Sequence, residues 1–147
     1  MARIIYLYIS VLCFTTLCIT SCNEASISST HDIRIAFYNT ENTFDTIDDT
    51  LTDDDDFTLQ GKNLWNDVKY LQKIENISNV ISSINASIIG LCEVENDDVL
   101  HDLTVKSSDK TNKDYRCITI DSGDERGLAP AIIYDNDALL YISHDSI

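Results

Sequence analysis

The sequence has few basic residues: its 147 residues include 10 Lys and Arg against 25 Asp and Glu, a formal net charge of −15. This imbalance argues against a stand-alone protein that binds nucleic acid or anionic membranes through charge. Five cysteines are too few for a disulfide scaffold, and no paired Cys and His spacing indicates a zinc site. The length allows one domain at most, and the apolar content of 44% suffices for a buried core. The composition therefore indicates an acidic globular protein that is one domain or part of one.

Residues 1–22 are typical of an export signal. Arg3 is the only charge, an apolar run extends from Ile4 to Ile19, and small residues follow. Ser and Thr interrupt this run, which makes it marginal as a membrane span. The ending Ile-Thr-Ser-Cys resembles a bacterial lipobox and predicts that Cys22 is lipidated and becomes the new N-terminus. We therefore expect an exported lipoprotein anchored in the cell envelope; the alternative is an ordinary signal peptide or an uncleaved anchor.

Residues 23–32 are polar and Ser-rich, which is typical of a tether, and residues 33–147 are expected to fold. The first predicted strand covers residues 33–38, where apolar side chains alternate. The second covers residues 87–94 and is apolar on both sides until Glu93. This pattern is typical of a central strand that is buried on two faces.

The clearest helix is predicted over residues 62–86. Its apolar residues recur at spacings of three and four, which places them on one stripe: Leu64, Val68, Leu71, Ile74, Ile77, Ile81 and Ile84. A short helix is predicted to follow Asn96 or Asp97, either of which could cap it. Further strands are predicted at 115–120, 131–134 and 139–142. Strand, helix and buried strand form a βαβ-like opening, which predicts a layered α/β or α+β domain with helices packed on a sheet.

Glu93 and Asn39 are the first candidates for chemistry. A carboxylate at the end of a buried strand is costly unless it is paired, hydrogen-bonded or bound to a cation. A helical crossover favours parallel strands, whose carboxyl ends meet at one edge, so Asn39 is expected beside Glu93. One carboxylate and one amide oxygen suit Mg²⁺, which keeps waters for a phosphate substrate. The alternative is that Glu93 only begins a solvent-exposed loop.

Four segments together resemble the endonuclease/exonuclease/phosphatase superfamily. Residues 37–45, Phe-Tyr-Asn-Thr-Glu-Asn-Thr-Phe-Asp, resemble the opening strand motif of its secreted bacterial branch. Residues 89–96, Ile-Gly-Leu-Cys-Glu-Val-Glu-Asn, resemble the second motif, whose first Glu binds metal. Residues 124–127 and 131–134 are similar to a later turn and strand. The helix pattern of the same branch is followed by Trp65, Tyr70, Lys73 and Ile77.

The resemblance implies the N-terminal half of a four-layer α/β/β/α sandwich. It also implies divalent-metal-dependent hydrolysis of phosphate esters, of nuclease or phosphatase type, with a small phosphate ester or nucleic acid as substrate. By match, Glu93 would bind Mg²⁺ or Mn²⁺, and Asn39 would orient or share that metal site. Arg126 and Asn42 are candidate substrate-binding residues; the alternative for Arg126 is a salt bridge with Asp124 within its turn. No protein partner can be inferred.

The sequence departs from the family pattern because no residue matches the catalytic base. Full members are longer, and their second half supplies a general-base His that matches no residue here. His101 is expected at the surface, and His144 lies outside the pattern. We therefore expect a chain that is incomplete for catalysis. The alternatives to an enzyme are a catalytically inactive truncated lipoprotein and a non-enzymatic binding module that keeps the scaffold.

Two further features leave alternatives open. The run Asp53–Asp56 predicts a solvated acidic loop; Ca²⁺ binding is the alternative, although the run lacks the spaced ligands of a calcium loop. Cys92 and Cys117 could form a disulfide if their strands are adjacent, and otherwise are expected as buried free thiols.

Overall fold

The computed structural model describes residues 32–120 and 122–145, which belong to one compact unit, His31–Ile147. Its elements are, in order, β1 (Ile35–Thr43), the 3-10 turn η1 (Asp55–Phe57), α2 (Asp67–Ile84), β2 (Ile88–Val94), α3 (Asp97–Lys110), β3 (Tyr115–Thr119) and β4 (Ala129–Asp135). The predicted signal with Cys22, and the tether except Asp32, lie outside the described residues. Within the described part of the chain, no helix has the length and hydropathy needed to cross a membrane.

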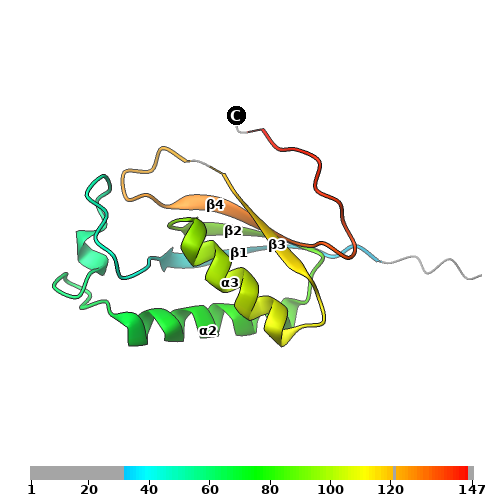
Figure 1. Cartoon of the computed structure of the whole chain (residues 1–147), viewed down its shortest axis with the longest axis horizontal. Helices are drawn as coiled ribbons and strands as arrows, with labels where there is room; N and C mark the ends of the chain where they lie inside the picture. The colour runs from blue at the N-terminus through cyan, green and yellow to red at the C-terminus, as the bar shows by residue number, and fades with distance from the viewer. Residues whose placement is uncertain (1–31, 121, 146–147) are drawn as a thin grey trace, which may run out of the picture. The chain divides into compact units, whose positions relative to one another are not determined.

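The strands form one mixed sheet in the order β1-β2-β4-β3 (Figure 1). β1 and β2 are parallel and are joined through α2, whereas β4 runs antiparallel to β2 and to β3. α2 and α3 contact each other and lie on the same side of the sheet. The fold is therefore α+β, as predicted, and the βαβ opening is confirmed.

The core lies between the two helices and the sheet. It consists of residues that are at most 4% exposed: Ile74, Ile77, Ile81, Ala86, Ile89, Leu91, Val94, Val99, Leu100, Leu103, Tyr115, Ala131 and Ile133. β2 is central in the sheet, as predicted, but only one of its faces is fully buried. Ile89 and Leu91 face the helices, whereas Ile88, Gly90 and Cys92 alternate with them and are half-buried. The difference arises because both helices cover the same side.

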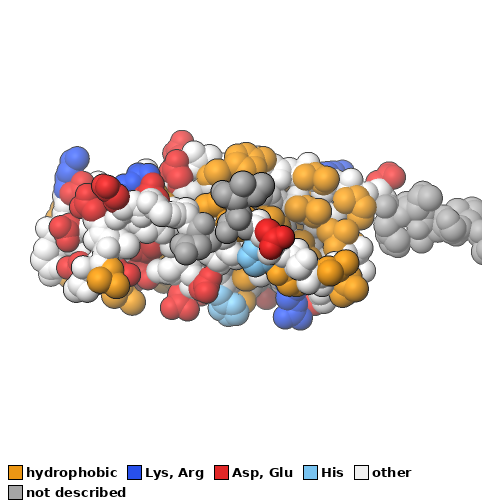
Figure 2. All heavy atoms as spheres, turned by 90° about the horizontal axis from the view of Figure 1, so that it is seen from above, with side chains coloured by type: hydrophobic (Ala, Val, Ile, Leu, Met, Phe, Trp, Pro, Cys, Tyr) orange, Lys and Arg blue, Asp and Glu red, His pale blue; other side chains and the backbone are white. Residues whose placement is uncertain are grey.

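The sheet face opposite the helices, which we call the open face, carries exposed apolar side chains. Ile35 and Phe37 of β1 are each 71% exposed. Figure 2 shows hydrophobic side chains gathered on this side of the molecule. The prediction of a strand at 139–142 is wrong, because these residues form no strand and Leu140 is 84% exposed. Instead of pairing through its backbone, this segment packs the ring of Tyr141 against that of Tyr134, with centroids 6.4 Å apart.

The helix predicted over residues 62–86 is shorter in the structure, and the prediction that all its apolar residues share one face is wrong in part. Leu64 precedes α2, and Leu64, Val68 and Leu71 are 60%, 77% and 62% exposed. The predicted stripe passes through consecutive steps of three residues, each of which turns about 300° around a helix. Three such steps separate Val68 from Ile77, so the two side chains lie on opposite sides of the helix. The packed face therefore begins only at Tyr70.

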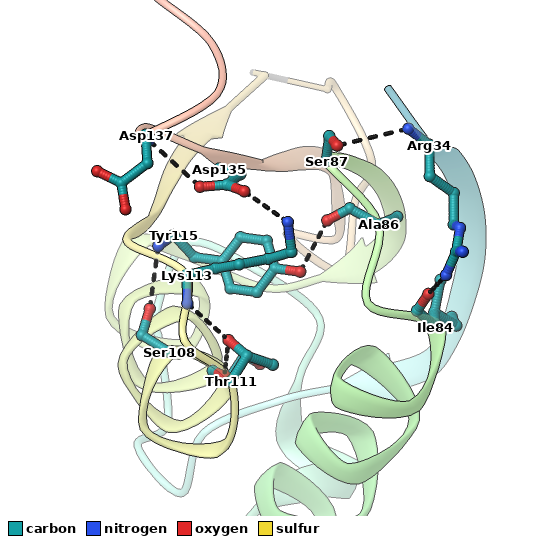
Figure 3. A network of polar contacts seen from close by, with 11 residues as sticks. Arg34, Ile84, Ala86, Ser87, Ser108, Thr111, Lys113, Tyr115, Asp135 and Asp137 are labelled. Atoms are coloured by element: carbon teal, nitrogen blue, oxygen red, sulfur yellow. Dashed lines mark hydrogen bonds and ion pairs between the residues drawn. The ribbon is translucent and has the colours of Figure 1, made fainter. Parts of the chain in front are cut away.

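Polar contacts close the end of the sheet where β2 begins and β4 ends (Figure 3). The Tyr115 hydroxyl donates a hydrogen bond to the Ala86 carbonyl at 2.8 Å. Lys113 Nζ lies 2.5 Å from a carboxylate oxygen of Asp135, which is only 5% exposed. A buried carboxylate needs such a partner. The opposite end of the sheet, where β1 and β2 finish, is more irregular.

Candidate functional site

Glu93 lies near the carboxyl end of β2 with an unusual backbone conformation. Its φ is +62°, and Glu41 and Asn42 near the end of β1 have φ of +58° and +57°. Such left-handed conformations cost non-glycine residues of order 1–3 kcal/mol each. The β1–β2 register shifts between Asn39 and Thr43, so the irregularity is shared by both strands. Strain concentrated at one place in the sheet indicates a functional site.

Both oxygens of the Glu93 carboxylate accept hydrogen bonds from β1. Asn39 Nδ2 donates to Oε1 at 3.1 Å, and the Asn42 backbone N–H donates to Oε2 at 2.8 Å. Asn39 Oδ1 in turn accepts from the Glu41 N–H at 2.9 Å. Because a backbone N–H can only donate, this bond fixes which end of the Asn39 amide faces Glu93. The structure brings Asn39 and Glu93 together, and this arrangement favours an orienting role for Asn39 over direct metal ligation.

Glu95 adds a second carboxylate close to the end of β2. Its Oε2 accepts a hydrogen bond from the Asp45 N–H at 2.7 Å. Burial, helped by the charges of Asp45, Asp54 and Asp49, raises the pKa of Glu95 to about 7, although the hydrogen bond from Asp45 acts in the opposite direction. Negative charge therefore accumulates between the end of β2 and the loop that follows β1.

Arg126 reaches the site from the turn between β3 and β4. Its Nη1 donates to Asn42 Oδ1 at 3.0 Å, and its Nη2 lies 3.2 Å from Asp124 Oδ2. The hydrogen bond with Asp124 raises the pKa of Arg126, and the negative charges of Asp124 and Glu93 act in the same direction. The salt bridge that we considered as the alternative is present. It holds the guanidinium beside Asn42, and the substrate-binding roles of both residues stay predictions.

Lys73, which the sequence places in the helix pattern of the family without a role, also lies at this site. Its Nζ donates to the Glu41 carbonyl at 2.8 Å. Burial lowers the pKa of Lys73, and the charges of Glu41 and Glu93 oppose that shift. The contact depends on the left-handed turn at Glu41, which no spacing in the sequence reveals.

The remaining candidates lie elsewhere. His101 is exposed on α3, and the ring of His144 hydrogen-bonds the Tyr141 hydroxyl. Cys92 and Cys117 are free, half-buried thiols. β4 lies between their strands, so the disulfide alternative is wrong.

Two places in the described residues offer oxygen ligands for a metal. Glu93 presents one carboxylate that is held in a fixed orientation, which fits Mg²⁺, since this ion binds through one or two carboxylates and completes its shell with water and phosphate. The second place is the loop between β1 and α2. There, carboxylate oxygens of Asp48, Asp54 and Asp55 lie within 4.8 Å of one another.

Comparison with models of protein families shows the family to which the chain belongs. A model described as the Endonuclease/Exonuclease/phosphatase family matches residues 34–147. The chain belongs to this family. The resemblance in the sequence is thereby confirmed, and membership in the Endonuclease/Exonuclease/phosphatase family suggests hydrolysis of the phosphoesterase or nuclease type with a divalent metal. The matched residues include both strand ends that meet at Glu93 and the turn that carries Arg126. Neither the curated proteins nor the solved structures compared with the chain gave a match.

Proposed function

We propose that this chain supplies the metal- and phosphate-binding part of a divalent-metal-dependent phosphoesterase. The observation that carries the proposal is the Glu93 carboxylate, which Asn39 and Asn42 hold at the ends of two parallel strands. Ligands of open α/β sheets bind beyond the carboxyl ends of strands, which is where this carboxylate lies. Membership in the family supports a phosphate ester as the substrate class.

Each residue has a distinct part in the proposal. Glu93 would hold Mg²⁺ or Mn²⁺, and the bound cation would polarise a phosphoryl oxygen and stabilise charge on the leaving oxygen. Asn39 keeps the carboxylate oriented. Arg126, presented beside Asn42, would pair with phosphate oxygens through its planar guanidinium. The proposal assigns no general base to a described residue. The acidic balance of the chain favours a small phosphodiester or phosphomonoester, or nucleic acid that is engaged mainly through the metal.

The test is Mn²⁺ binding, followed through the loss of the free-ion paramagnetic resonance signal in the presence of excess Ca²⁺. Glu93→Gln removes the charge but keeps an oxygen acceptor, so we expect at least about tenfold weaker Mn²⁺ binding, or about 1.4 kcal/mol. Glu125→Gln is the matched control, because it removes one charge from an exposed residue of the Arg126 turn. Unchanged affinity in Glu93→Gln would refute the site. Hydrolysis of an activated phosphodiester is the second readout: Mn²⁺ binding without turnover favours the inactive lipoprotein or the binding module for this chain.

We also propose that the protein is anchored to a membrane of the bacterial envelope through lipid on Cys22. The support is the lipobox-like ending of residues 1–22. Mass spectrometry of the N-terminal peptide from the membrane fraction should show the mass of attached acyl chains. Cys22→Ala should prevent lipidation. An unmodified Cys22 in the wild-type protein would reject the anchor.

A further inference from the structure

The loop between β1 and α2 buries a carboxylate that has too few partners. Asp54 is 2% exposed. Its Oδ2 accepts a hydrogen bond from the Asp49 N–H at 3.1 Å, whereas its Oδ1 is buried and has no hydrogen-bond partner among the described residues. An unpaired charge away from water is one of the most costly features a fold can contain. A bound cation or protonation would stabilise such a group.

Two other carboxylates converge on the same place. Asp48 and Asp55 each bring a carboxylate oxygen to within 4.8 Å of one from Asp54, and all three oxygens are mutually this close. Like charges at this separation repel one another. None of the ion pairs formed by the described residues compensates them, since the one in this loop joins Lys62 to Asp56 at 3.9 Å.

A solvated acidic loop, the simpler interpretation, explains only part of this arrangement. Asp48 and Asp55 are exposed, so water can stabilise their charges. Asp54 is enclosed, its Oδ1 has no hydrogen-bond partner among the described residues, and its carboxylate belongs to the same group as the two exposed ones. Protonation of Asp54 alone would neutralise its charge but would leave the convergence of the other two unexplained. A cation accounts for both observations.

The frame around the three aspartates is tightly packed. The ring of Phe57 stacks on that of Phe44 with centroids 4.1 Å apart. A Cβ at Gly61 would lie 2.0 Å from the Asp55 carbonyl oxygen, so the chain approaches the 3-10 turn as only glycine allows. The Asp53 N–H also donates to the Glu125 carbonyl at 2.9 Å, which ties the loop to the turn that carries Arg126. A cation held here would therefore fix that turn as well.

We propose that Asp48, Asp54 and Asp55 form a calcium site that is separate from the metal site at Glu93. Calcium is the expected ion because it accepts six to eight oxygen ligands in adaptable geometry, including several carboxylates from one loop. Magnesium binds through fewer carboxylates and depends on substrate phosphate for part of its shell. The proposal does not depend on the catalytic proposal, since no ligand is shared between the two sites.

The chain contains its own reporter for this site. Trp65 is the only tryptophan, and its ring lies edge-on to that of Phe57 at 5.9 Å, directly beside the 3-10 turn. Tb³⁺ substitutes for Ca²⁺ at oxygen sites, and its luminescence can be excited through a nearby indole. We expect saturable Tb³⁺ luminescence excited through Trp65, displaced by Ca²⁺ at lower concentrations than by Mg²⁺. We also expect Ca²⁺ to raise the Tm relative to chelator.

Variants of exposed residues keep the test independent of folding. Asp55→Asn and Asp48→Asn should each weaken Ca²⁺ binding at least about tenfold, which corresponds to about 1.4 kcal/mol. Asp53→Asn removes the same charge from an exposed neighbour outside the cluster, so its affinity should stay within about twofold, roughly 0.4 kcal/mol. Asp54→Asn should raise the Tm in chelator, because it removes the uncompensated charge, and should abolish the rise caused by Ca²⁺.

Three results would overturn the calcium site. The first is a lack of saturable Tb³⁺ and Ca²⁺ binding. The second is a loss in Asp53→Asn as large as that in Asp55→Asn, because it would show diffuse attraction of counterions. The third is a loss of the Ca²⁺ response in Glu93→Gln, because it would place the ion at the strand ends. Retained Ca²⁺ binding in Glu93→Gln with lost Mn²⁺ binding supports two separate sites.

Discussion

Asn39 donates a hydrogen bond to Glu93 across the parallel β1–β2 pair, at 3.1 Å between Nδ2 and Oε1. The same amide accepts a hydrogen bond from the Glu41 N–H, so its side chain cannot rotate without losing both contacts. The carboxylate is thus oriented by the protein itself. Partners of this kind behind a metal ligand raise metal affinity by holding the ligand in place.

Removal of the Asn39 amide should therefore weaken the metal site without unfolding the chain. We expect Asn39→Ala to lower Mn²⁺ affinity by about 10- to 100-fold, as is typical for residues that position metal ligands. The Tm should change little, since Asn39 is exposed. Asn79→Ala, an exposed asparagine on α2, is the matched control. Equal Mn²⁺ affinities in the two variants would contradict the orienting role.

The buried face of α2 can be tested with two residues that the sequence pattern places on one stripe. Ile81 is fully buried, whereas Leu71 is 62% exposed. Ile81→Ala should lower the free energy of unfolding by about 2–5 kcal/mol, since it leaves a cavity in the core. Leu71→Ala should stay within about 0.5 kcal/mol. Urea unfolding measures both, and similar losses would contradict the face described here.

The sequence predicts the first half of this fold well because the information there is local. Alternation and helical period place β1, α2 and β2, and a helical crossover makes the two strands parallel. The prediction fails where burial depends on which elements meet. The apolar run of residues 139–142 has the composition of a strand, yet in the structure it pairs with none of the four strands.

The same distinction applies to the candidate site. Asn39 and Glu93 could be predicted as neighbours, because parallel strands bring their carboxyl ends together. The contact of Arg126 with Asn42 spans 84 positions in the chain and requires the left-handed turn at the end of β1. Asp54 is one of four consecutive aspartates, and only packing of the loop decides which of them is buried.

The contact between α2 and α3 should depend on pH through Glu75. Lys110 and Lys106 approach its carboxylate at 2.5 and 3.2 Å, and hydrogen bonds from Lys110 and then Lys106 lower the pKa of Glu75 below 4.5. A carboxyl group whose pKa is lowered by folding stabilises the fold at pH values above its unfolded-state pKa. This contribution is lost as the pH falls through the folded-state pKa.

Glu75→Gln should therefore lower the Tm slightly near neutral pH, and its difference from the wild type should shrink toward zero in acid. Thermal unfolding over a pH series measures this. Asp109→Asn is the control, since Asp109 is exposed on α3 and makes none of the ion pairs found in the described residues. A Tm difference for Glu75→Gln that does not vary with pH would show that the ion pairs contribute nothing.

The open face of the sheet should drive self-association of the chain. Phe37 is 71% exposed and lies across Gly90, where an added Cβ would be 2.9 Å from its ring. It stands on β1, an edge strand whose outer side is unpaired in the described sheet, and edges with apolar faces invite association. Phe37→Ser should therefore reduce association in sedimentation measurements over a concentration series. Ile47→Ser, which changes a loop residue that is 69% exposed, should have a smaller effect. Equal effects would attribute the association to general exposure of apolar side chains rather than to this face.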